Sequence, residues 1–140
     1  MKLREKNFNG VSNNKLNEKL TSDQRSLIME NEKNKLETES VFPKNLAEEI
    51  EYQLSSIVSK QLLKKLNGNI TLFAFDKDES LTEHTSPFEA VIYIVDGSME
   101  ITVGGKPFVV TSGHFIILPP NVPHGVKAIE KAKMTLTMIK

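Results

Sequence analysis

Residues 89–105 read EAVIYIVDGSMEITVGG, two runs of β-branched and aromatic side chains divided by Asp96-Gly97 and ended by Gly104-Gly105. Such side chains favour strands, and residues that tolerate positive φ favour two-residue turns. Two-residue turns join antiparallel strands, because a parallel connection needs a dozen or more residues. The stretch therefore predicts consecutive antiparallel strands at 89–96 and 98–103.

Short apolar runs bounded by turn residues continue on both sides of this stretch. Asn67-Gly68 is a further pair of turn residues between two such runs. Together the runs predict an all-β domain over residues 41–140, with strands near 56–65, 69–75, 89–96, 98–103, 107–110, 114–118, 124–129 and 132–139.

The strands differ in how their apolar residues are distributed. Residues 133–138, KMTLTM, alternate as a strand with one wet face does. Residues 91–95, VIYIV, and 115–118, FIIL, are apolar on both faces, so both faces need cover. The inner face fills a core, and the outer face requires the N-terminal helix or a second subunit. We expect a homodimer.

Residues 1–40 are rich in Asn, Lys and Glu and lack strand-like alternation, so we expect a polar extension that is partly helical or disordered. Thr21-Ser-Asp-Gln24 has the spacing of a capping box, which predicts a helix to about residue 36. This helix is either solvated or binds a partner. Asn45 is a second cap and predicts a short helix before Tyr52. The first helix carries a thin apolar stripe: Leu20, Leu27, Ile28 and Leu36.

Charge and composition exclude several classes of function. Basic and acidic residues number 18 each, so no net field draws the protein to nucleic acid or to an anionic membrane. The absence of cysteine excludes disulfides, thiolate ligands and a cysteine nucleophile. No run approaches the roughly 20 apolar residues of a membrane span, and the first residues carry no signal-peptide core. We expect a cytoplasmic protein that binds neither nucleic acid nor membrane.

Two histidines stand in recognisable surroundings, within EHTSPFEAVIYIVDG at 83–97 and PPNVPH at 119–124. This arrangement resembles the cupin family, in which a His-x-His pair and a later Glu precede a glycine turn and another His follows a proline-rich loop. The resemblance covers about Ile57 to the C-terminus. It implies a small jelly-roll β-barrel, a double-stranded β-helix, with a ligand pocket inside. Residues 83–90 also look like small single-domain bacterial cupins of unassigned activity.

The resemblance implies metal ligands at His84 and His124, while Ser86 and Ala90 replace the other two ligands of the family. By strand parity, residues 84, 86, 90, 92 and 94 share one face, which places Ser86, Ala90 and Ile92 in the ligand pocket. Two imidazoles alone hold a divalent ion weakly. The implied cofactor is therefore one divalent transition metal ion (Fe, Zn, Mn or Ni) or none.

Two carboxylates near the histidines, Glu83 and Glu89, are candidates for a third ligand. Both have the parity of the opposite face, so a bulge or loop would have to turn either of them inward. In the alternative interpretation, both imidazoles are neutral, hydrogen-bonded pocket residues that face Ser86 or water.

Three functions remain open at this point, and no motif identifies a substrate or a catalytic residue. The first is a metal-dependent enzyme acting on a small molecule. The second is a metal-free module that binds or senses a small ligand in a mostly apolar pocket. The third is a metal-free enzyme with His84 or His124 as general base, for which no acid partner lies on the same face.

Other residues have simpler interpretations. His114 is expected in an exposed turn, and Tyr93 on the outer face of its strand. Gly104-Gly105 is a hairpin turn and not a phosphate cradle, since no helix start follows it. Four large apolar residues are assigned to the core: Phe73, Phe75, Met134 and Met138.

Overall fold

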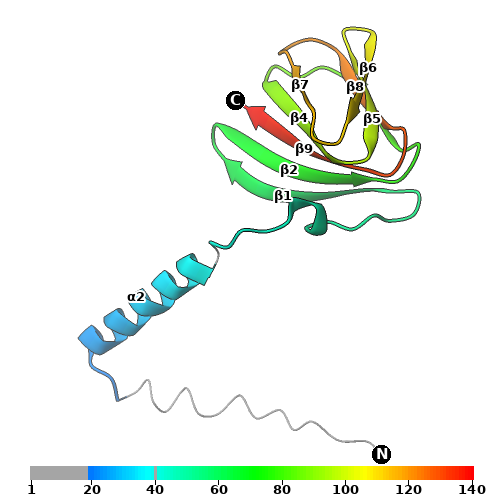
Figure 1. The fold of residues 1–140 in the computed structure, drawn as a ribbon. Helices are drawn as coiled ribbons and strands as arrows, with labels where there is room; N and C mark the ends of the chain where they lie inside the picture. The colour runs from blue at the N-terminus through cyan, green and yellow to red at the C-terminus, as the bar shows by residue number, and fades with distance from the viewer. Residues whose placement is uncertain (1–18, 40) are drawn as a thin grey trace, which may run out of the picture. The chain divides into compact units, whose positions relative to one another are not determined.

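The computed structural model describes residues 19–39 and 41–140, and it divides the chain into two units, Met1–Pro43 and Lys44–Lys140 (Figure 1). The first unit contains helix α2 (Ser22–Glu39). The backbone N–H of Thr21 donates to Gln24 Oε1 at 2.9 Å, and that of Gln24 donates to Thr21 Oγ1 at 3.2 Å. The predicted capping box is thus confirmed. Residues 1–18 of the predicted extension, and the side chain of Leu36 in its stripe, lie outside the described part.

The second unit begins with η1 (Leu46–Glu48), one turn of 3-10 helix capped by Asn45 as predicted, whose Oδ1 accepts from the Ala47 N–H at 3.1 Å. Eight strands lie within one residue of their predicted bounds. The nine strands are β1 (Ile57–Lys65), β2 (Gly68–Phe75), β3 (Ser80–His84), β4 (Glu89–Asp96), β5 (Ser98–Val103), β6 (Lys106–Thr111), β7 (Phe115–Leu118), β8 (His124–Ala128) and β9 (Ala132–Ile139).

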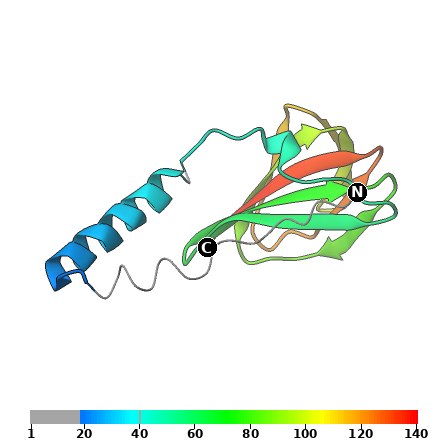
Figure 2. The same cartoon turned by 90° about the horizontal axis from the view of Figure 1, so that it is seen from below.

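The strands form two sheets, ordered β1-β2-β9-β4-β7 and β3-β8-β5-β6, with every neighbouring pair antiparallel. The sheets face each other, as Figures 1 and 2 show from two directions. This is the predicted jelly-roll arrangement. One detail of the prediction was wrong: β4 and β5 lie in different sheets, so Asp96-Gly97 carries the chain between sheets and is not a hairpin.

The other two predicted turns have different outcomes. Gly104 and Gly105 join β5 to β6 with φ of 57° and 79°, which confirms the expected hairpin. β1 and β2 form the expected antiparallel hairpin, but Lys65 pairs with Gly68, so the two-residue turn is Leu66-Asn67. Gly68 has no positive φ and is the first residue of β2. Glycine is needed there for space, because a Cβ would lie 2.5 Å from the carbonyl oxygen of Met138.

The core fills the space between the two sheets. Of the four residues assigned to it, Phe75 and Met134 are buried, and Phe73 and Met138 pack against its edge. Burial of these apolar side chains is the main driving force for this fold. The largest fully buried members of the core between the sheets are Phe75, Ile92, Ile94, Met99, Ile101, Leu118 and Met134.

Part of the outer face of the five-stranded sheet is covered by residues 44–56. Ile50 packs on Leu72 there in a second apolar cluster. Lys133 Nζ donates to the carbonyl of Ala47 at 2.6 Å and lies 4.6 Å from the centre of the Tyr52 ring. Burial, and then a 2.7 Å hydrogen bond donated to Asp96, raise the pKa of the Tyr52 phenol. The cover therefore comes from a segment that the sequence did not indicate.

Within residues 44–140, the far side of the same outer face has no cover. Tyr93, Phe115 and Ile117 are exposed at 39%, 64% and 49%. Within residues 44–140, the predicted outer cover of β4 is found at Val95, which packs on the second cluster, and it is not found at Phe115 and Ile117 of β7. Tyr93 lies on the outer face, as expected.

Candidate functional site

The two histidines of the sequence motifs lie at one end of the barrel. His84 ends β3 and His124 begins β8, and these strands are antiparallel neighbours. The short connections 85–88 and 119–123 bring the start of β4 and the end of β7 to the same end. We call it the histidine end: the end at which β3 and β7 finish and β4 and β8 begin.

A β-bulge in β3 aligns the two imidazoles. Leu81 pairs with Val126 and His84 pairs with His124, so two residues of β3 stand opposite Gly125 alone. Without the extra residue, Glu83 would pair with His124 and His84 would turn to the other face. Gly125 allows this close approach, since a Cβ there would lie 3.3 Å from the backbone nitrogen of Glu83.

The imidazoles touch each other, and the backbone orients both. Their ring centres lie 4.5 Å apart and the ring planes meet at 65°. Nδ1 of His84 lies 2.9 Å from the carbonyl oxygen of Thr82, and Nδ1 of His124 lies 3.0 Å from that of Val122. A carbonyl only accepts, so each neutral ring carries its proton on Nδ1 and a lone pair on Nε2.

The pair extends from the interior to the surface. His124 is 8% exposed, whereas His84 is an exposed residue, so the expectation that both imidazoles are enclosed was wrong for His84. Within the described ranges, neither Nε2 makes a hydrogen bond, and every buried side-chain nitrogen has a partner. Nε2 of His124 therefore reaches accessible space.

The other predicted pocket residues lie near the same end. Ser86 is half-buried in the 85–88 connection, where its Oγ accepts from the Phe88 N–H at 3.2 Å. The carbonyl of Ser86 accepts from the Asn121 N–H at 2.7 Å, which joins the two connections. Ala90 and Ile92 are buried on the inner face of β4, at 5% and 1% exposure. Ala90 occupies the row nearest the histidine end, and Ile92 lies one row deeper.

No carboxylate joins the two imidazoles. In residues 19–39 and 41–140 there is no group of three or more His, Cys, Asp or Glu side chains that could hold a metal ion. The bulge that Glu83 needed is present, yet Glu83 and Glu89 are both exposed and neither completes such a group. The protein donors at the histidine end are therefore two imidazole nitrogens, and water or a bound molecule would supply the rest.

The third histidine has no part in this site. His114 is exposed in the turn before β7, and its Nδ1 lies 3.1 Å from the hydroxyl oxygen of Thr111. The prediction of an exposed turn residue is confirmed, and His114 provides a natural control in experiments on the other two.

Two facing antiparallel sheets with a histidine pair at one end define a jelly-roll protein with a candidate binding site inside. The cupin domain model matches residues 71–140. The chain therefore belongs to the cupin family, which supports a small-molecule-binding or metal-associated function. No functionally curated protein matches the sequence. None of the described helices is long and apolar enough to cross a membrane.

Solved structures agree with this family. A Cupin 2 conserved barrel domain protein from Leptotrichia buccalis is 44% identical, with a TM-score of 0.67, over 69% of this chain and 47% of that chain. A conserved protein of unknown function from Streptococcus pyogenes is 29% identical, with a TM-score of 0.69, over 71% and 88%. A cupin superfamily protein from Desulfitobacterium hafniense, 22% identical over 71% and 91% with a TM-score of 0.68, shares the fold.

Proposed function

We propose that this protein binds a small molecule at the histidine end, where His84 and His124 together hold one divalent transition metal ion. The observation that carries the proposal is the contact of two imidazoles whose Nδ1 atoms are both tied to backbone carbonyls. Such outer hydrogen bonds fix the ring orientation and the tautomer of metal-binding histidines. In this proposal Ser86, Ala90 and Ile92 line the space beside the ion.

The spacing of the rings suits this role. Two imidazoles that bind one ion through nitrogens about 2.0–2.1 Å away have ring centres roughly 4.5 to 5.2 Å apart, from a right angle to a tetrahedral angle at the metal. The 4.5 Å between His84 and His124 falls at the short end of that range. Two nitrogen donors without a carboxylate favour nickel or zinc over manganese and iron, by the usual order of divalent affinities.

When bound, the ion would act as a Lewis acid and would orient the small molecule through its open positions. The chain's own residues have separate tasks. The tethered imidazoles keep their Nε2 lone pairs available, and the buried Ala90 and Ile92 present an apolar wall. A mostly apolar wall with a few polar groups is the usual composition of a small-molecule site.

Calorimetric titration with Zn²⁺ and Ni²⁺ tests the metal site. We expect one equivalent to bind, and His84→Ala or His124→Ala each to weaken binding about 30-fold or more, because each change leaves a single nitrogen donor. His114→Ala is the matched control and should bind like the wild type. Folding of each variant is checked by thermal unfolding. If the two site variants bind as tightly as the His114→Ala protein, the metal proposal is wrong.

A metal-free binding module is the second candidate, favoured by the presence of only two protein donors. In that case the purified protein would take up under about a tenth of an equivalent of metal. Small ligands would still shift the NMR signals of the His124 ring. The same titrations thus separate the two candidates.

We also propose that the protein is a homodimer, joined through the uncovered part of the five-stranded sheet. Tyr93 pairs with Phe115 and Val91 pairs with Ile117, so these side chains form one apolar patch across β4 and β7. Contiguous exposed apolar patches often mark protein interfaces. The expected cytoplasmic location stays a prediction.

Light scattering after size-exclusion chromatography tests the dimer. At micromolar concentration the wild type should have twice the mass of one chain, and Ile117→Lys should halve it, because a buried lysine in the interface would lack a partner. Val109→Lys is the control, since Val109 is exposed at 66% on β6 of the other sheet. A monomeric wild type contradicts the proposal.

A further inference from the structure

The ionisable side chains on the inner faces of the two sheets gather at the histidine end. All nine strands belong to the described part of the chain, and their pairing shows which residues share the face of the core. Besides His84 and His124, the inner positions hold two ionisable residues, Lys64 and Lys106, and no Asp or Glu. The chain as a whole has no net charge, so the excess of basic over acidic side chains is a local property of these inner positions.

Lys64 reaches the inner face through a bulge. It belongs to a row of residues that pair from strand to strand across the five-stranded sheet: Lys64, Asn69, Met138 and Ala90. The register of β1 shifts between Gln61 and Leu63. Without this shift Leu63 would take the inner position and Lys64 the outer one. The bulge instead leaves Leu63 48% exposed and gives a lysine the inner position.

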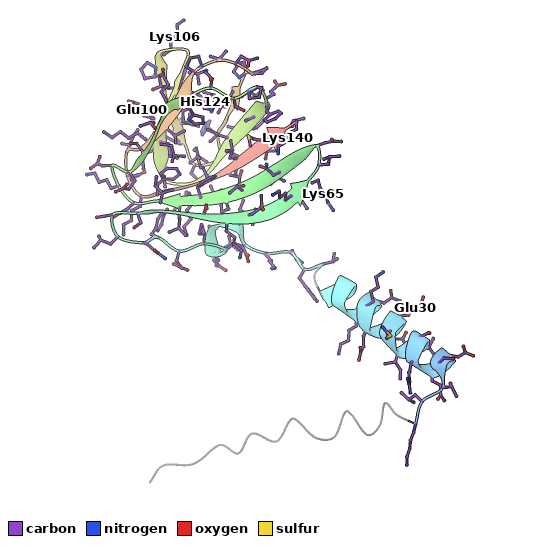
Figure 3. The ribbon with its side chains drawn as sticks, turned by 180° about the vertical axis from the view of Figure 1, so that it is seen from behind. Glu30, Lys65, Glu100, Lys106, His124 and Lys140 are labelled. Carbon is purple, nitrogen blue, oxygen red and sulfur yellow. The ribbon has the colours of Figure 1, made fainter. Side chains whose placement is uncertain are left out.

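Lys106 belongs to the facing row of the other sheet. Pairing runs from Lys106 to Val103, then to His124 and His84. Figure 3 marks His124 between the sheets and Lys106 at the β5–β6 hairpin. Neighbouring strands are about 4.8 Å apart, so Lys106 stands about 10 Å across the sheet from His124. The row therefore begins with a cation and ends with the imidazole pair.

The two lysines stand on edge strands of different sheets, β1 and β6. Both side chains are exposed to solvent. Two carboxylates also occur at this end, but Glu89 lies on the outer face of β4 and Glu83 lies in the bulge of β3. The inner face thus offers an anion positive charge at its rim and an apolar surface below.

We infer that the small molecule bound at the histidine end is an organic anion: a carboxylate with an apolar body, selected by Lys64 and Lys106. The inference rests on the proposed function and names the chemical class of its ligand. The apolar body would meet Ala90, Ile92 and Val103, and the carboxylate would meet any ion held by the imidazoles. The two lysines, on edge strands of different sheets, would attract the carboxylate from a distance.

Benzoate and benzyl alcohol provide a matched pair of probes, because they have the same ring and differ in charge. Each is titrated into the full chain at low ionic strength, with the NMR signals of the His124 ring as the readout. We expect benzoate to bind about five times more tightly than benzyl alcohol. Lys64→Gln and Lys106→Gln should each weaken benzoate about threefold and leave benzyl alcohol unchanged.

Lys65→Gln is the control, because this substitution removes the same charge one residue away. Lys65 pairs with Gly68, and its side chain lies on the opposite face of the sheet. It should leave the preference for benzoate intact, and added salt should abolish that preference in every protein. Equal binding of the two probes, or equal effects of Lys64→Gln and Lys65→Gln, would overturn the inference and leave the proposed function standing. If neither probe moves the His124 signals, the inference fails as well, and the Zn²⁺ and Ni²⁺ titrations decide the proposed function on their own.

Discussion

Replacing Gly97 by alanine should lower the free energy of unfolding by about 3–5 kcal/mol, near the upper limit for a single substitution. Gly97 has φ +73°, where a side chain is strained. A Cβ at this position would overlap the carbonyl oxygen of Lys131 and lie 3.0 Å from Cα of Ala132. Both neighbours are backbone atoms, so no rotamer change relieves the clash. The strain falls where the chain passes from one sheet to the other.

Urea unfolding followed by circular dichroism measures this effect. Gly113→Ala is the control, since Gly113 has φ +84° but a Cβ there would meet nothing within 4 Å. It should cost about 1 kcal/mol, the conformational penalty alone. The two substitutions thus separate backbone strain from the clash with residues 131–132. Equal losses of stability would mean that this close approach contributes nothing.

The sequence predicted the strands well where local patterns reflect burial. β4 and β5 are β-branched runs with clear turn residues, and both were placed at their observed bounds. β3 was missed because Ser80–His84 carries a single apolar residue, Leu81, and pairs only with β8. The turn at Asp96-Gly97 was read as a hairpin because local sequence does not show which strands pair. That choice depends on contacts with β9 and β7, far along the chain.

The histidine end could be predicted only in part. The motifs predicted that His84 and His124 share one site, and the structure places their rings in contact. The exposure of His84 depends on β3 being an edge strand, which the sequence did not reveal. The position of Lys64 was missed because a one-residue bulge reverses the face of every residue beyond it, and no local pattern marks that bulge.

Replacing Ala90 by glutamate should raise the affinity for Zn²⁺ or Ni²⁺ about 100-fold, by adding a carboxylate to two imidazoles. Ala90 is buried on the inner face of β4, in the row nearest the histidine end. By the resemblance to the cupin motif, it also stands at the position of that family's glutamate ligand. Without metal, the buried carboxylate lacks a partner and should lower the free energy of unfolding by a few kcal/mol. Metal should therefore raise the melting temperature of this variant far more than that of the wild type.

Calorimetric titration and thermal unfolding, each with and without Zn²⁺, measure the two effects together. Val91→Glu is the matched control: it adds the same charge at the next residue, which pairs with Ile117 on the outer face. Its metal affinity should equal that of the wild type, because an outward carboxylate cannot reach the imidazoles. A folded Ala90→Glu protein that binds metal no better than Val91→Glu would show that a carboxylate at position 90 does not reach the ion. The placement of Ala90 beside the ion would then be wrong, while the titrations of His84→Ala and His124→Ala still decide the metal proposal.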